Sequence, residues 1–488
     1  MNMAAQCLDK APDQCAIIDL TGGERRDVNF AELAQMTDNL ASALMQSIQP
    51  GDRVGVLLTQ SPYCAAAHLA IWKIGAISVP LFKLFQHDAL KTRIDDAGCA
   101  IVVTDDDGAK QIGQLAPVFK VGSVGQAMSD IPIFDAKPDT PAVLIYTSGT
   151  TGTPKGALHG HRILDGHIPG VSISHDGLGH PNDCLWTPAD WAWIGGLFDV
   201  LMPGLALGVP VVASRMPKFS PEACQQIVDT GNVRNVFFPP TALRMLKAGG
   251  FAVTGLRSVA SGGEPLGAEM LAWGQDALGV TINEFYGQTE CNMVVSSCGS
   301  QFDPRPGCMG RAVPGFHVEV IDETGDATQG EGDIAIRFDA PSMMLKYWNR
   351  PEETAAKFRG DWLLTGDRGR REDDFIRFVG REDDVITSSG YRIGPSEIED
   401  CLMTHPDVAT VGVVGKPDAL RTELVKAYVV LNDNASATAQ DLQNHVKDRL
   451  ASYSYPREIE FVSHLPMTVT GKVIRKELKA HAAAELTT

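Results

Sequence analysis

The chain has 488 residues and is 44% hydrophobic, so it is too long for one ordinary domain and apolar enough for a sizeable core. Its 42 basic and 60 acidic residues give a formal net charge of -18, which disfavours a nucleic-acid partner because phosphates need a basic face. The ten cysteines form no CxxC pair, and the N-terminus lacks a basic region followed by an apolar run. These features predict a cytoplasmic enzyme with reduced thiols and no signal peptide.

Apolar strand-like runs alternate with helical patterns from residue 52 onward. Strands are expected at 52–59, 99–105, 142–147, 209–214, 235–238 and 256–261, and helices at 61–76 and 239–248. This alternation predicts parallel sheets with helices on their faces. The apolar stretch at 191–214 contains Asp199, two prolines and four glycines, so we predict a helix followed by a buried strand rather than a membrane span.

The pattern changes twice in the second half of the chain. Short alternating strands at 317–322, 332–338 and 373–380 are joined by Asp/Gly turns and predict an antiparallel or barrel-like unit. After the charged junction at 380–386, we expect helices at 395–405, 438–450 and 473–486 and strands at 408–415, 425–431 and 458–462. The last part therefore predicts a small α+β domain with a hinge at its start.

The stretch YTSGTTGTPKG at 146–156 follows an apolar strand and precedes the helical pattern at 161–167. Its glycines allow tight turns, its consecutive amides can form an anion-binding nest, and its hydroxyls add donors. Lys155 adds a point charge suited to phosphate. Ala157 follows Gly156, so the segment is not a GxxxxGK[ST] P-loop. We predict a phosphate-binding loop between a strand and a helix.

TSGTTGTPKG at 147–156 resembles the phosphate-loop signature of the adenylate-forming superfamily, which includes acyl-CoA synthetases, adenylation domains and firefly luciferase. Further segments agree with this family in their order along the chain. They are SGGEP at 261–265 and EFYGQTE at 284–290 (nucleotide), LLTGDRG at 363–369 (ribose), GREDDVITSSGYRIGPSEIE at 380–399 (hinge) and LPMTVTGKVIRKEL at 465–478 (catalytic lysine). Together these segments most resemble those of medium-chain acyl-CoA synthetases.

The resemblance implies an α/β fold in two domains. Residues 1–381 would form an N-terminal ATP- and acyl-binding domain of parallel-sheet subdomains, with a barrel-like part at about 315–380. Residues 382–488 would form a mobile α+β C-terminal domain that carries the catalytic lysine. Homo-oligomer formation stays open.

The implied reaction is attack of a carboxylate on the α-phosphate of ATP, release of pyrophosphate, and transfer of the acyl group to the thiol of CoA. A carboxylic acid has a pKa near 4 and is already nucleophilic at neutral pH. The obstacle is repulsion between an anion and a polyanion, so catalysis must come from positioning and charge neutralisation. The resemblance implies ATP and CoA as co-substrates, Mg²⁺ as cofactor and a small carboxylic acid as substrate.

The resemblance also assigns roles to single residues. Lys472 would be the cation between carboxylate and α-phosphate, Thr289 a donor to that phosphate and Arg392 a phosphate contact. Glu290 would hold Mg²⁺, and Asp383 matches the hinge position. The other implied contacts are Thr147, Ser148, Gly149, Thr150, Thr151, Gly152 and Lys155 at the phosphates, Gly263, Glu264 and Tyr286 at the adenine, Asp367 and Arg381 at the ribose, and Ser389 and Gly390 at the CoA tunnel.

The acyl pocket is implied at Trp193, Gly195, Gly262 and Gly287. Acetate-specific members of the family carry Trp at the position of Gly287, so the glycine here predicts an open pocket. Trp193 and the nearby Trp191 can fill its floor. We therefore predict a short branched or medium-chain acid, with an aromatic acid as the alternative.

The sequence disfavours two other functions within the same superfamily. An amino-acid adenylation domain places an Asp after Phe for the substrate ammonium, but Phe198-Asp199 lies several residues beyond that position and is interpreted as chance. A non-catalytic acyl-AMP- or ATP-binding homologue is disfavoured because Lys472, Glu290 and Thr289 occur together with Asp367.

Overall fold

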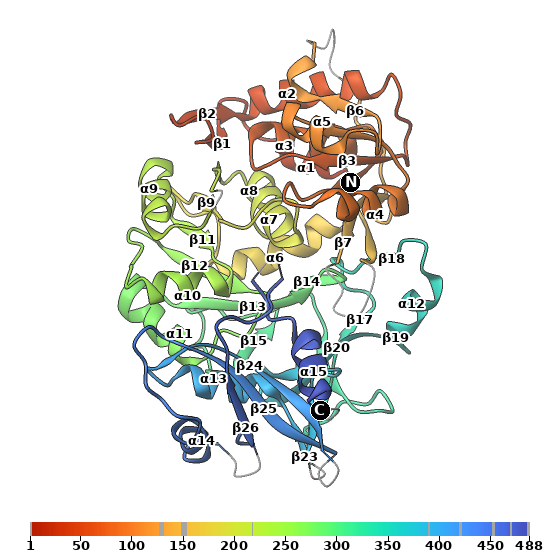
Figure 1. The fold of residues 1–488 in the computed structure, drawn as a ribbon. Helices are drawn as coiled ribbons and strands as arrows, with labels where there is room; N and C mark the ends of the chain where they lie inside the picture. The colour runs from red at the N-terminus through yellow and green to blue at the C-terminus, as the bar shows by residue number, and fades with distance from the viewer. Residues whose placement is uncertain are drawn as a thin grey trace.

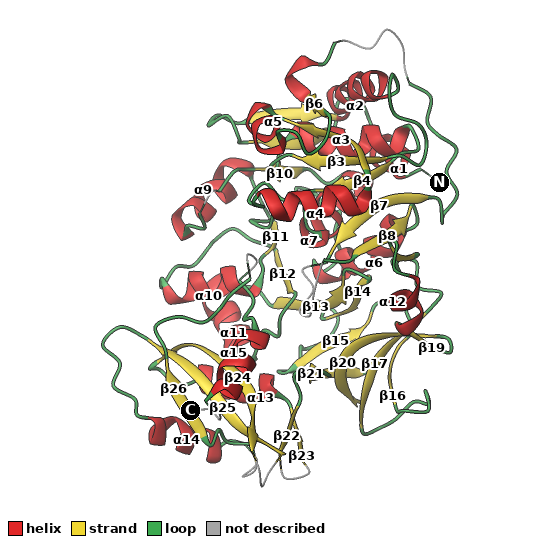
Figure 2. Ribbon diagram, turned by 45° about the vertical axis from the view of Figure 1, so that its right-hand side comes forward, coloured by secondary structure: helices red, strands yellow, loops and turns green. Residues whose placement is uncertain are grey.

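The computed structural model describes residues 2–125, 131–147, 154–216, 218–388, 391–418, 422–450, 454–468 and 471–485, and of residues 391 and 392 only the backbone. These residues build three β-sheets with helices packed on them. Figures 1 and 2 show the sheets following one another from the N-terminal helices at one end to the C-terminal strands at the other. The predicted α/β class is confirmed.

One sheet has seven strands in the order β18-β8-β7-β4-β3-β5-β6. Its parallel centre consists of β3 (Arg53–Leu57), β4 (Ile77–Pro80), β5 (Cys99–Thr104), β6 (Val118–Lys120) and β7 (Pro141–Tyr146), with α3 (Pro62–Lys73), α4 (His87–Ala97), α5 (Asp106–Ile112) and η1 (Val121–Ser123) beside it. Helix α3 begins at Pro62 because the Ser61 side chain accepts a hydrogen bond from the Cys64 amide. Its alanine-rich surface is almost wholly buried.

The predicted phosphate loop joins two antiparallel strands. β7 pairs with β8 (Gly156–Gly160), and α6 (Ile163–Ser174) begins only after β8. The expected direct passage from the loop into a helix is therefore wrong. GALHG has no β-branched residue, so it gives no strand signal. Its conformation is set by pairing with β7 on one side and with the distant β18 (Lys346–Tyr347) on the other.

A second sheet has fourteen strands and changes from parallel to antiparallel along its length. The parallel part comprises β1 (Cys15–Asp19), β9 (Leu185–Trp186), β10 (Val211–Ala213), β11 (Asn235–Phe237), β12 (Ser258–Gly262) and β13 (Ile282–Gln288), with antiparallel β2 (Arg26–Asn29) at its edge. Its helical segments are α1 (Met3–Leu8), α2 (Phe30–Leu44), α7 (Ile194–Gly196), η2 (Leu197–Leu201), α8 (Met202–Leu207), α9 (Pro221–Gly231), α10 (Pro240–Ala248), α11 (Ala268–Trp273) and η3 (Gly274–Leu278).

The antiparallel part continues the same sheet. It comprises β14 (Cys291–Ser296), β15 (Cys308–Ala312), β16 (Val318–Ile321), β17 (Glu331–Arg337), β19 (Phe358–Arg359), β20 (Trp362–Glu372) and β21 (Phe375–Arg381), with α12 (Pro351–Ala356) beside it. β15 pairs with both β14 and β21. The unit predicted at about 315–380 is therefore joined to the large sheet through a strand that begins before residue 315.

The C-terminal unit has its own five-stranded sheet. It contains β22 (Ile386–Ser388), β23 (Tyr391–Ile393), β24 (Val408–Asp418), β25 (Thr422–Leu431) and β26 (Glu458–Phe461), with α13 (Pro395–Met403), α14 (Ala439–Lys447) and α15 (Arg475–Ala484). Helices α13 and α15 pack on β24. The chain boundary at 381/382 and the mobility of this unit stay predictions.

The 191–214 stretch folds into short helices followed by β10. Across the described ranges, no helix is both long and apolar enough to cross a membrane. All ten cysteines are free thiols and most are buried.

Candidate active site

A cavity of about 2030 Å³ lies between the large sheet and the C-terminal unit. Its walls come from the β13–β14 turn, β20, β21 and α10–α11 on one side, and from α13 and the 467–476 segment on the other. Figure 1 shows the C-terminal unit in blue beside β13 and α11. Close contacts join the two sides, because a β-carbon at Gly471 would lie 2.6 Å from Thr241 and one at Gly267 would lie 3.3 Å from Asp400.

Lys472 extends from a tight turn of the C-terminal unit into this cavity. Its amide donates to Thr468 Oγ1 at 3.0 Å, and Gly471 takes the left-handed conformation (φ +83°) that the turn requires. Lys472 Nζ lies 3.8 Å from the position that a β-carbon of Gly263 would occupy. Within the described ranges no carboxylate forms an ion pair with Lys472, so an exposed, uncompensated cation faces the nucleotide segment that the sequence predicts.

Asp367 on β20 is held by donors from β13. Tyr286 donates its hydroxyl to Asp367 Oδ2 at 2.5 Å, and Gln288 Nε2 donates to the same oxygen at 2.8 Å. Arg381 lies 3.5 Å from the other oxygen, Oδ1. Burial raises the pKa of Asp367, while these donors and Arg381 oppose the rise. Asp367 lines the cavity, and its Oδ1 keeps acceptor capacity suited to a diol such as ribose.

Glu290 follows Thr289 in the turn after β13, and both line the cavity. The Tyr347 hydroxyl donates to one oxygen of Glu290 in a short hydrogen bond, and burial keeps Tyr347 protonated by raising its pKa. In the described part of the chain no cation pairs with Glu290, although Lys155 lies close by, 5.4 Å from the centre of the Tyr347 ring. An unneutralised carboxylate with one oxygen oriented by Tyr347 fits a ligand for Mg²⁺.

Sequence reasoning missed three residues that position this site: Gln288, Tyr347 and Lys357. Lys357 donates to the carbonyl oxygens of Leu364 and Thr365 at 3.2 and 3.3 Å, which fixes the strand that carries Asp367. Burial lowers the pKa of Lys357, and the charges of Glu290 and Asp367 oppose that shift. Gln288 lies within the EFYGQTE segment at 284–290 but has no role assigned there, and no local pattern marks Tyr347 or Lys357 as part of the site.

Several predicted residues lie outside the described residues: Ser148, Gly149, Thr150, Thr151, Gly152, Ser389 and Gly390. The two ends of the phosphate loop are described, and the Thr147 amide donates to the Lys155 carbonyl at 2.9 Å. Only the backbone of Arg392 is described, in β23.

Glu264 and Asp383 each pair with an arginine. Glu264 lines the cavity and accepts from Arg244 at 2.8 Å. Asp383 accepts from Arg381 at 3.0 Å, so the predicted hinge residue is tied to the residue beside Asp367.

The four predicted acyl-pocket residues do not form one open wall. Gly287 lines the cavity, but a β-carbon there would lie 2.5 Å from the Met293 amide nitrogen. The close approach of β13 and β14 therefore requires glycine at position 287. The absence of a side chain there has a structural reason besides any effect on the size of the acyl pocket. Gly262 is similar, because a β-carbon would lie 2.5 Å from the Phe285 ring.

The other two predicted residues, Trp193 and Gly195, are not among the residues that line the cavity, and both lie next to aromatic rings. Trp193 packs against Phe82 and Phe85, with ring centres 5.4 and 5.8 Å away. A β-carbon at Gly195 would lie 3.0 Å from Phe237, whose ring is 5.2 Å from that of Phe285. Phe285 lines the cavity, so Phe237 lies between Gly195 and a residue of the cavity wall.

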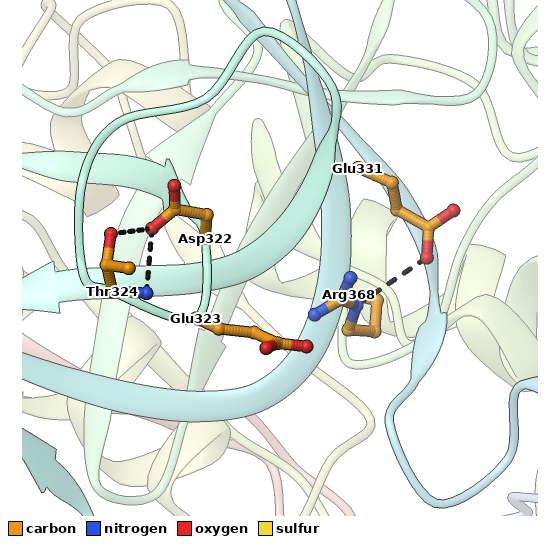
Figure 3. A pocket seen from close by; sticks show the side chains of 5 residues that line it. All are labelled: Asp322, Glu323, Thr324, Glu331 and Arg368. Atoms are coloured by element: carbon orange, nitrogen blue, oxygen red, sulfur yellow. Dashed lines mark hydrogen bonds and ion pairs between the residues drawn. The ribbon is translucent and has the colours of Figure 1, made fainter.

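A smaller pocket of about 390 Å³ lies on the antiparallel part of the large sheet (Figure 3). Arg368 there pairs with Glu331 at 3.5 Å and with Asp333 at 2.8 Å, and Asp322 accepts from Thr324 within its own turn. The charge of Arg368 is therefore compensated within the protein, and the pocket offers no comparable site.

Glu284 and Asp400 face each other across the interface between the sheet and the C-terminal unit. Glu284 on β13 is 7% exposed, and burial, followed by the charge of Asp400, raises its pKa to about 8. Burial also raises the pKa of Asp400, to about 7. At about pH 6, Glu284 and Asp400 therefore stay largely protonated in the packed interface, whereas free carboxyl groups would be ionised.

Raising the pH from about 6 to about 9 should weaken this interface by on the order of 2 kcal/mol. Each of these carboxyl groups has a higher pKa in the packed interface than when it is free. The free energy that favours packing therefore falls as the pH rises from the free pKa to the raised pKa, and it is constant above that value. Glu284→Gln stays neutral and should flatten the dependence of the thermal unfolding midpoint on pH, whereas Glu24→Gln, at an exposed site, should not. Equal pH dependence in Glu284→Gln and the unaltered protein would show that Glu284 does not titrate there.

Comparison with known proteins gives consistent matches along the chain. The model for the AMP-binding enzyme family matches residues 4–348, and that for the AMP-binding enzyme C-terminal domain matches residues 397–472. The chain is 33% identical to mitochondrial acyl-coenzyme A synthetase ACSM2 of Rattus norvegicus, over 94% of this chain and 86% of that protein. It is also 33% identical to acetyl-coenzyme A synthetase of Bacillus subtilis, over 92% and 84%. The solved structure of ATP-bound MatB from Rhodopseudomonas palustris aligns with a TM-score of 0.88 at 26% identity, covering 98% of each chain.

Proposed function

We propose a substrate for this chain, which belongs to the AMP-binding enzyme family and is an AMP-forming acid–CoA ligase: a carboxylic acid longer than acetate, short and branched or of medium chain length. Overall identity does not decide chain length, because an acetyl-CoA synthetase and a mitochondrial acyl-CoA synthetase are equally identical to this chain. The observation that carries the proposal is the missing side chain at Gly195, where a β-carbon would lie 3.0 Å from Phe237, whose ring packs against the cavity-lining Phe285.

Adenylation in this site would be driven by charge neutralisation. Lys472 Nζ, close to Gly263, would lie between the acid's carboxylate and the α-phosphate and offset their repulsion. Thr289 would donate to that phosphate, and Asp367 would accept from the ribose hydroxyls. Glu290 would hold Mg²⁺, which adds positive charge at the phosphates of ATP when bound. No general base is needed, since the acid is ionised at neutral pH.

Thioester formation would follow a rotation of the C-terminal unit about Asp383. In the observed orientation the C-terminal unit packs against the N-terminal part, with a β-carbon of Gly471 2.6 Å from Thr241 and one of Gly267 3.3 Å from Asp400. These contacts would have to separate during the rotation. Rotation would remove Lys472 from the acyl phosphate and bring Ser389 and Gly390 to the path of CoA. The thiol of CoA has a pKa near 8.5, so a thiolate fraction is present at neutral pH.

An aromatic acid is the second candidate. Phe237 lies beside Gly195 and packs on the cavity-lining Phe285, and aromatic rings favour offset or edge-to-face contacts with one another. The test is pyrophosphate release with ATP, CoA and a panel of acids from acetate to dodecanoate, including branched acids and benzoate. The highest kcat/KM with acetate would contradict both candidates.

Gly195→Leu should shift the preference toward acetate or propionate. The new side chain would fill space next to Phe237, and each excluded methylene of the substrate should cost about 0.8 kcal/mol. About two lost methylenes correspond to roughly tenfold in kcat/KM for hexanoate. Gly22→Leu, where nothing lies within 4 Å, is the matched control. An unchanged chain-length profile in a folded Gly195→Leu protein would exclude Gly195 from the acyl pocket.

A further inference from the structure

Asp199 is a buried acid with no cation beside it, and burial raises its pKa well above the usual range although the hydrogen bonds from Asn292 oppose the rise. It lies in the π-helical segment η2 and is 3% exposed. Asn292 Nδ2 donates to both of its oxygens, at 2.8 and 3.0 Å. Among the described residues no lysine or arginine pairs with it, and the nearest basic group is His167, whose Nε2 is 3.9 Å from Asp199 Oδ1. A buried carboxylate with one neutral amide as its partner is costly.

His167 cannot supply the missing charge. Its Nδ1 lies 2.7 Å from the Ile163 carbonyl, and burial lowers its pKa to about 4, so the ring is neutral with the proton on Nδ1. His167 Nε2 is then an acceptor, and it has no hydrogen-bond partner in the described structure. An ionised Asp199 thus lacks a cation, while a protonated Asp199 lacks an acceptor within hydrogen-bond reach.

The position of Asp199 links it to the proposed acyl pocket. Its Oδ2 would lie 3.5 Å from a β-carbon of Gly195, and Gly195 is partly accessible although it lies among buried side chains. Its partner Asn292 lies directly beside Gly287, which lines the cavity. Two of the glycines predicted around the acyl group therefore lie next to this pair, Gly195 beside Asp199 and Gly287 beside Asn292. The other side chain close to Gly195 is the ring of Phe237.

We propose that Asp199 selects a carboxylic acid whose far end carries a hydrogen-bond donor, an amino or a hydroxyl group. The donor would bond to Asp199 Oδ2 beside Gly195, while Asn292 orients the carboxylate. A protonated amine would also supply the missing positive charge. This inference rests on the proposed function, and it narrows the substrate from any acid longer than acetate to one with a polar end.

The test compares matched acids that differ only at the far end. Butyrate, hexanoate and octanoate are each compared with their terminal hydroxy and amino derivatives, by kcat/KM for pyrophosphate release. We expect at least one substituted acid to exceed its alkyl partner by tenfold or more, because an unpaired buried group penalises the analogue that lacks the donor. The amino and hydroxy arms identify which donor is used.

Two variants separate selection from a structural role. Asp199→Leu should lower kcat/KM for the substituted acid relative to its alkyl partner and so remove or reverse the preference. Asp199→Asn, which keeps the size of the side chain, should lose a preference for the amine and retain most of a preference for the hydroxyl. Thermal unfolding midpoints check folding, and Asp199→Asn serves as the second test if Asp199→Leu does not fold.

The outcomes distinguish this inference from the function on which it rests. Absence of pyrophosphate release with every acid would overturn the proposed function. Good activity with the alkyl acids, together with weaker activity for all substituted ones, would overturn only the role of Asp199. A uniform loss across all acids in both variants would likewise overturn it, because it would make the Asp199–Asn292 pair structural.

Discussion

Lys472→Ala should slow the formation of acyl-AMP by about 10² to 10³, the usual cost of losing one such electrostatic group. Lys472 Nζ faces Gly263 with no carboxylate partner in the described ranges, so its charge is available to the carboxylate and the α-phosphate. The charge matters where these anions meet, which places the loss in the first half-reaction. Single-turnover measurement of acyl-AMP gives this rate directly.

The second half-reaction provides the internal control for Lys472. Supplied with pre-made acyl-AMP and CoA, Lys472→Ala should form acyl-CoA at close to the normal rate, because rotation about Asp383 takes residue 472 away from the acyl carbon. Lys137 is an exposed lysine distant in sequence from Lys472, and Lys137→Ala should leave the rates of both half-reactions unchanged. Equal slowing of both steps by Lys472→Ala would mean that the lysine is structural or that the rotation does not occur.

Asp367→Ala should raise the KM for ATP by about 30- to 100-fold, equivalent to about 2–3 kcal/mol for a hydrogen bond to a charged group. The substitution removes the acceptor for ribose and also leaves the Tyr286 hydroxyl and Gln288 Nε2 without a partner. The expected kcat is less affected, since the ribose contact is made in the ground state as well as in the transition state.

Tyr286→Phe separates these two effects. It removes a donor to Asp367 Oδ2 and leaves the carboxylate, Gln288 and Arg381 in place. Its KM for ATP should rise less than tenfold, as expected for one neutral donor. If Tyr286→Phe were as severe as Asp367→Ala, the role of Asp367 would be to hold the β13–β20 contact rather than ribose.

Several strands with an apolar run could be predicted from the sequence, and two strands that mix glycine with polar or charged residues could not. β3, β5 and β7 and the helix α3 lie where their patterns indicate. β8 and β20 were missed, since GALHG and the LLTGDRG segment mix glycine with polar or charged residues. In both strands the extended backbone is fixed by neighbours on each side, and β17 and β21 do this for β20.

The residues of the candidate site also fall into two groups, those that the sequence identifies and those that it does not. Lys472, Glu290 and Asp367 lie in motifs that can be identified from the sequence, and the cavity brings them together. Some residues that position them come from segments that carry no motif, such as Tyr347, whose hydroxyl donates a hydrogen bond to Glu290. Asp199 was interpreted as chance because of its distance from an expected position along the chain. Helical spacing places it beside Gly195, but only the fold brings Asn292 to its carboxyl group.

The most direct test of the account is the fate of ATP. The unaltered protein is incubated with ATP, Mg²⁺, CoA and its preferred acid, and the products are followed by phosphorus NMR together with acyl-CoA. The account predicts AMP and pyrophosphate in amounts equal to acyl-CoA, with no ATP consumed when the acid is omitted. Formation of ADP and phosphate with acyl-CoA would contradict attack at the α-phosphate and the role of Lys472 in it.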